Sequence, residues 1–93
     1  MRMNKEALNY FFKGYFHQDW FAEYGIFENA VRDFCDNESE SRVTSVKIAI
    51  DELIAHGDVT EQMIYEFGGY VKPSALDFTP EEWLTKVVEI MGE

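Results

Sequence analysis

Two histidines and their neighbours are the residues of this sequence best suited to acid–base or metal chemistry. His17 and Asp19 lie two positions apart and could supply two metal ligands, but a third would have to come from elsewhere in the chain. The simpler interpretation is that Asp19 caps a turn and that His17 closes a helix, where a cation is favourable. His56 precedes Gly57 in the same way. We therefore expect no metal and no cofactor, with a small hydrolase that uses His17 and Asp19 as an alternative.

The remaining residues offer little to a catalytic site. Cys35 is the single cysteine, which excludes an internal disulfide and is typical of a reducing compartment. It falls on the apolar face of a predicted helix, where a thiol is usually a small buried hydrophobe. The sequence has no Gly-rich phosphate loop, nucleophile elbow or paired-cysteine zinc pattern. The adjacent pairs Asp51-Glu52 and Glu81-Glu82 point about 100° apart on a helix and do not converge. We therefore expect no catalytic residue and no enzyme.

Net charge is the most unusual property of the composition. Eighteen Asp and Glu face eight Lys and Arg, which gives a formal net charge of -10. This charge repels nucleic acid and anionic membranes and attracts basic proteins. A simpler alternative is that acidity serves solubility alone. No run approaches the ~20 apolar residues of a membrane span, and no signal peptide is evident. We therefore expect a cytoplasmic protein.

Helices are the elements that must position these residues. Apolar side chains at helical spacing predict four helices, over residues 4–17, 26–36, 41–56 and 61–67. A fifth begins after Thr79, with Pro80 in its first position and Glu82 completing a capping box. Strand signals are weak. The 93 residues suit one domain. We expect residues 1–93 to form an all-α, compact single-domain bundle of about five short helices.

One block of sequence resembles a known family. Tyr15-Phe16-His17-Gln18-Asp19-Trp20 follows a predicted aromatic helix and is similar to a block of CdiI, the immunity proteins of bacterial contact-dependent growth inhibition. Members of this family also have a later amphipathic helix with an acidic pair, like the one in Asp51-Glu52-Leu53. The similarity therefore extends across residues 8–55. The C-terminal third resembles the family only in general character.

The resemblance implies a function. Immunity proteins of this kind lie in the cytoplasm of the producing bacterium and its siblings and have neither catalytic activity nor a cofactor. Each binds the C-terminal toxin domain of a matching CdiA surface protein and blocks it. These toxins are often nucleases, and many attack tRNA.

The charge of the chain agrees with this implied partner. A nuclease is basic where it holds phosphates, and complementary potentials raise association rates toward about 10⁸–10⁹ M⁻¹s⁻¹. The alternative is an acidic helical adaptor, or an inhibitor module for another basic protein. An adjacent CdiA-type gene would distinguish the two. The sequence does not indicate an oligomeric state.

Partner-binding residues are expected on the acidic surface of the helix over 26–36 and the loop after it. Four carboxylates lie within eight residues and create a local negative field: Asp33, Asp36, Glu38 and Glu40. Glu23 and Glu28 flank them, and Tyr70 is a second candidate because tyrosine is enriched at interface hot spots. For each carboxylate the alternative is a merely solvated side chain. The block from Tyr15 to Trp20 is shared within the family, whereas each immunity protein must recognise a different toxin. Phe16 and Trp20 are therefore expected in the core and not in the partner-binding surface.

Overall fold

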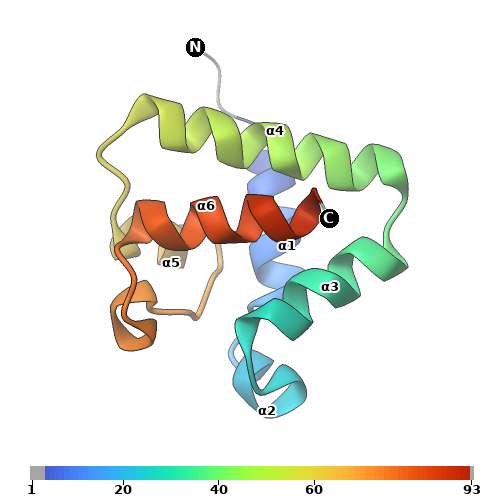
Figure 1. Cartoon of the computed structure of the whole chain (residues 1–93), viewed down its shortest axis with the longest axis horizontal. Coiled ribbons are helices and arrows are strands. Elements are labelled where there is room, and N and C mark those ends of the chain that lie inside the picture. The colour runs from blue at the N-terminus through green and yellow to red at the C-terminus, as the bar shows by residue number, and fades with distance from the viewer. Residues whose placement is uncertain (1–3, 93) are drawn as a thin grey trace.

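The computed structural model describes residues 4–92, and within that range it contains helices and no strand. The helices are α1 (Lys5–Tyr15), α2 (Trp20–Tyr24), α3 (Phe27–Asn37), α4 (Glu40–His56), α5 (Glu61–Glu66), the 3₁₀ helix η1 (Pro73–Leu76) and α6 (Pro80–Met91). α4 and α6 pack side by side and run in opposite directions, while α1 crosses behind them and packs on α4 (Figure 1). The predicted all-α class is confirmed, and α2 is added to the five predicted helices.

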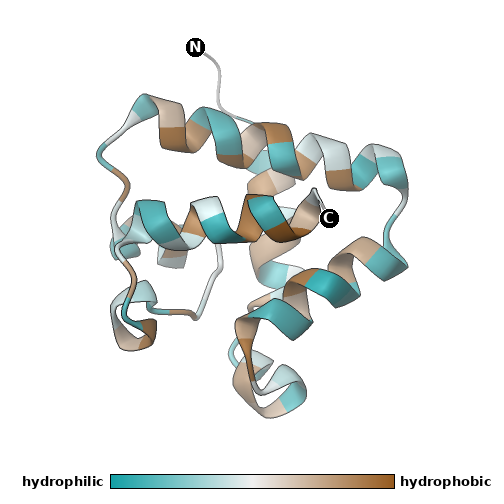
Figure 2. Ribbon diagram, viewed as in Figure 1, coloured by the Kyte–Doolittle hydropathy of each residue, from teal (hydrophilic) through white to brown (hydrophobic). Residues whose placement is uncertain are grey.

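Aromatic side chains dominate the core. Phe11 contacts Phe34 with 4.9 Å between ring centroids, and Phe16 contacts Trp83 at 5.3 Å. Phe16 is fully buried and Trp20 is 7% exposed, which confirms both as core residues. Figure 2 shows bands of hydrophobic residues recurring along α3, α4 and α6. These three helices pack on one another, so their bands meet in the interior.

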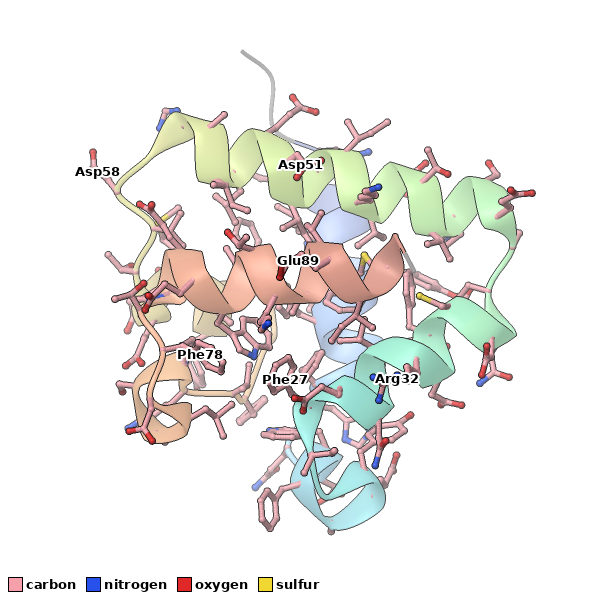
Figure 3. All side chains as sticks on the ribbon, viewed as in Figure 1. Phe27, Arg32, Asp51, Asp58, Phe78 and Glu89 are labelled. Atoms are coloured by element: carbon pink, nitrogen blue, oxygen red, sulfur yellow. The ribbon has the colours of Figure 1, made fainter. Side chains whose placement is uncertain are left out.

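Capping determines where the helices begin. The hydroxyl of Thr79 accepts a hydrogen bond from the Glu82 backbone N–H, and the Glu82 carboxylate accepts one from the Thr79 N–H. The predicted capping box of α6 is thus confirmed. Phe27, at the start of α3, contacts the rings of both Phe78 and Trp83 at 6.0 and 5.7 Å, and this anchors the entry to α6 (Figure 3).

The helix ends differ from the prediction by a few residues. α1 ends at Tyr15 instead of residue 17, because the chain turns at Phe16 toward α2. Thr60 caps α5, since its hydroxyl accepts from the Met63 N–H. The segment between α5 and α6 contains η1, which starts at Pro73. Within residues 4–92 no helix combines the length and the hydrophobicity needed to cross a membrane.

Candidate partner-binding groove

An open groove of about 740 Å³ lies between α1 on one side and α2 and α3 on the other. We call it the tyrosine groove, and its lining residues are Glu6, Asn9, Tyr10, Lys13, Gly14, Tyr15, Tyr24, Asp33 and Glu38. Three of these residues are tyrosines, three are carboxylates and one is a lysine. The groove therefore combines aromatic walls with an excess of negative charge.

Glu38 is held in the groove by two tyrosines of α1. It stands just after α3, and its Oε1 accepts a hydrogen bond of 2.8 Å from the Tyr10 hydroxyl. Its Oε2 accepts one of 2.8 Å from the Tyr15 hydroxyl. The bond to Glu38 raises the pKa of Tyr10, while burial and then the bond to Glu38 raise the pKa of Tyr15. Both hydroxyls therefore stay protonated as donors, and the carboxylate has a fixed orientation.

Asp33 is fixed in a similar way from two directions. Its Oδ2 accepts a hydrogen bond of 2.7 Å from the Tyr24 hydroxyl, and its Oδ1 accepts one of 2.6 Å from the Asn37 amide. Burial, followed by the bond to Asp33, raises the pKa of Tyr24 to about 12. Burial and the bond to Glu38 are the main causes of the raised pKa of Tyr15, and the negative charge of Asp33 raises it further. The two carboxylates thus act on the same tyrosine.

Neither Asp33 nor Glu38 has a salt-bridge partner among residues 4–92, where the close acid–base pairs are His17–Glu23 and Lys86–Glu89. One guanidinium lies at the rim of the groove: Arg42 is over the Tyr10 ring, with its Cζ 4.1 Å from the centroid. Lys13 lines the groove but makes no ion pair with Asp33 or Glu38. The negative charge of these two carboxylates is therefore oriented by neutral donors and remains available to a cation from outside.

The structure brings two of the predicted partner-binding residues together, Asp33 and Glu38. Asp36 and Glu40 are exposed near the same end of α3 but do not line the groove. Glu23 lies beside His17, with 3.4 Å between Oε1 and Nε2. Their part in binding stays a prediction.

Two further predicted residues lie apart from the groove. Glu28 lines a small hollow between α3 and α6 with Arg32 and Glu89, which project from neighbouring helices in Figure 3. Tyr70 is 49% exposed and forms a T-shaped pair with Tyr65 at 5.4 Å between centroids, beside another hollow of about 420 Å³. The predicted residues therefore do not form one continuous site.

The tyrosine hydroxyls of the groove were missed by the sequence reasoning. Tyr15 lies on the buried face of α1, and its ring packs on Phe34, with centroids 5.1 Å apart. Its hydroxyl nevertheless reaches Glu38. A signal was present, because a tyrosine in place of phenylalanine on a buried stripe indicates a nearby partner for the hydroxyl.

His17 and Asp19 have a local structural role. His17 Nδ1 accepts a hydrogen bond of 3.1 Å from the Asp19 backbone N–H, and this closes the turn before α2. Asp19 stands at the N-cap of α2, but its side chain makes no capping hydrogen bond, so that part of the prediction is wrong. Cys35 is half-buried and packs against the core. Across residues 4–92, no three His, Cys, Asp or Glu side chains gather in a group that could hold a metal ion.

Comparison with known proteins gives one family match. A family model described as CdiI immunity protein matches residues 4–91. No curated protein and no solved structure matches the chain. The matched range includes every helix from α1 to α6 and the whole lining of the tyrosine groove. It extends well past residues 8–55, where the resemblance of the sequence is concentrated.

Proposed function

The chain belongs to the CdiI immunity protein family, whose members neutralise toxins, and from this membership we propose that its partner is a basic nuclease toxin. The toxin is the C-terminal domain of the cognate CdiA protein, and tRNA is the kind of substrate we propose for it. Neutralisation takes place in the cytoplasm, where the chain covers the positively charged surface on which the toxin holds nucleic acid.

The observation that supports this proposal most is the fixed, unpaired negative charge of the tyrosine groove. Asp33 and Glu38 are each held by two hydrogen bonds and have no ion-pair partner among residues 4–92. A nuclease binds phosphates through Lys and Arg, so its working surface is complementary to this groove. Because the carboxylates are oriented before the partner arrives, binding orders few side chains.

The electrostatics of the groove favour binding over catalysis. A general acid or base works best when its pKa lies near the operating pH. The pKa of Tyr15 and that of Tyr24 are instead raised further above neutrality, by burial and by the neighbouring carboxylates. Such tyrosines serve as neutral hydrogen-bond donors at physiological pH.

The proposal is tested with the toxin domain encoded beside this gene. The chain is co-expressed with that domain, survival of the cells is scored, and the purified pair is analysed by size-exclusion chromatography and calorimetry. We expect protection and a stable complex. Toxicity that the chain does not relieve, together with separate elution of the two proteins, would contradict the proposed partner.

A matched pair of variants tests the surface. Asp33→Asn with Glu38→Gln removes two charges from the groove, and Asp51→Asn with Asp58→Asn removes two from exposed positions on and after α4 (Figure 3). We expect the groove variant to weaken toxin binding by about 100-fold or more, since each of the two lost charge pairs costs on the order of 1.5 kcal/mol or more. The control variant is expected to bind nearly as the parent. Equal losses in both would show that net charge, not the groove, holds the toxin.

A further inference from the structure

The occupant of the tyrosine groove follows from the chemistry of its walls. We propose that the groove binds one arginine side chain of the partner and selects it over lysine. This inference rests on the proposed function for the identity of the partner, but the selectivity is a property of the groove itself.

The carboxylates have acceptor capacity left for a guanidinium. An ionised carboxylate offers about four lone-pair sites on its two oxygens. Glu38 uses two of them for Tyr10 and Tyr15, and Asp33 uses two for Tyr24 and Asn37. Each therefore retains about two acceptor sites. Arginine, with five N–H donors in a planar fork, can fill two sites of one carboxylate and still donate to a neighbouring acceptor, whereas an ammonium has three donors around a point charge.

The aromatic walls also favour a guanidinium. Arginine stacks on aromatic rings more readily than lysine does, because its cation is planar and weakly hydrated. The fold already contains such a contact at this rim, where Arg42 lies 4.1 Å from the ring centroid of Tyr10. Tyr10 bonds at the same time to Glu38, so one ring supports both a guanidinium and a carboxylate. An incoming arginine meets a similar combination at Tyr24, whose partly exposed ring carries the hydroxyl that bonds to Asp33.

The size and charge of the groove suit an inserted side chain with the residues around it. A volume of about 740 Å³ exceeds that of one side chain, and the groove is open along its length, so a protruding segment can enter. Three carboxylates and one lysine leave a formal charge of -2 in the lining (1 - 3 = -2). One incoming arginine reduces this excess and leaves Glu6 at the edge for a neighbouring cation.

The test uses the full chain and two probe peptides, acetyl-Gly-Arg-Gly-amide and acetyl-Gly-Lys-Gly-amide, at equal ionic strength. Tyrosine ring resonances are followed by NMR. We expect the arginine peptide to shift the rings of Tyr10, Tyr15 and Tyr24 saturably, with an affinity about tenfold higher than that of the lysine peptide. Equal shifts with both peptides, or shifts that do not saturate, would overturn the inference.

Variants locate the binding within the groove. Glu38→Gln is expected to abolish saturable shifts with the arginine peptide, and Asp51→Asn to leave them unchanged. Tyr15→Phe keeps the ring but removes one donor to Glu38, so it should weaken binding by a smaller factor than Glu38→Gln does. Circular dichroism confirms that each variant is folded. Undiminished arginine binding by folded Glu38→Gln would also overturn the inference.

The same readout separates this inference from the proposed function. If the chain captures and neutralises the toxin but treats the two peptides alike, the arginine site is wrong and the proposed function stands. If the arginine peptide is selected but the toxin is not bound, the site stands and the proposed function fails. Within the complex, one Arg→Lys change in the toxin should cost about tenfold in affinity against the parent chain, and almost nothing further against Glu38→Gln.

Discussion

The indole Nε1 of Trp20 donates a hydrogen bond of 2.9 Å to the carbonyl oxygen of Tyr70, 50 residues further along the chain. A second bond reinforces it, from the Tyr70 N–H to the carbonyl oxygen of Phe16 at 2.7 Å. The block from Tyr15 to Trp20 therefore fastens the segment that leads from α5 to η1. Its distinctive residues serve the fold, as the core positions of Phe16 and Trp20 indicate.

Replacing Trp20 with Phe tests this connection. The change leaves the Tyr70 carbonyl without its donor and reduces packing at a residue that is 7% exposed. We expect the free energy of unfolding to fall by about 1–3 kcal/mol, as measured by urea denaturation. Ile48→Leu is the control, because Ile48 is 52% exposed and should change stability by no more than about 0.5 kcal/mol. Equal effects of the two substitutions would contradict the role of Trp20 in holding the segment between α5 and η1.

The capping box of α6 gives a second prediction. Thr79→Ala removes the acceptor for the Glu82 N–H and should destabilise the fold by about 1 kcal/mol. Thr85→Ala makes the same substitution inside the same helix, where the hydroxyl bonds only to the Glu81 carbonyl oxygen of the preceding turn. Alanine is the better helix former there, so no loss is expected. Thermal unfolding of both variants measures the difference.

Alkaline pH gives a third prediction, which concerns the bond between Tyr24 and Asp33. The pKa of Tyr24 rises from 10.0 to about 12 in the folded state. Below pH 10 both states hold the proton and this contribution to stability is fully present; it is lost as the pH rises toward 12. Urea denaturation across this range should show falling stability. Tyr24→Phe should fall less steeply, and a slope equal to that of the parent would contradict the proposed cause.

Salt dependence gives a fourth prediction, which concerns the encounter with the toxin. Raising the ionic strength from about 0.01 M to about 1 M shortens the Debye length from about 30 Å to about 3 Å. Stopped-flow association should slow by tenfold or more, on the order expected for electrostatic steering, with a smaller change in dissociation. The variant with Asp33→Asn and Glu38→Gln should show a shallower dependence than the one with Asp51→Asn and Asp58→Asn. Association that does not respond to salt would exclude steering.

Much of the fold was predictable, because local rules determine it. The box at Thr79 and Glu82 and the apolar stripe of α1 each depend on residues within a few turns. α2 was harder to identify as a helix because it has five residues and lies in a segment that reads equally as a turn. η1 depends on Pro73 and on Asp77 in a left-handed conformation, which loop composition alone does not indicate.

The site was predictable only in part. Asp33 and Glu38 were expected from the density of charge along the chain, which is a local property. Their tyrosine partners were not, because the bond from Tyr15 to Glu38 joins residues 23 apart and depends on how α1 packs against α3. Tyr70 was a second candidate separate from the carboxylates, and it lies beside Tyr65 and a different hollow.

Tyr15 is part of both the core and the tyrosine groove, because its ring packs against Phe34 and its hydroxyl bonds to Glu38. A lineage that acquires a new toxin cannot change this residue without loosening the interior. Glu6, exposed at the edge of the groove, carries no such penalty. Substitution at Glu6 can therefore change the charge of the groove while the interior stays intact.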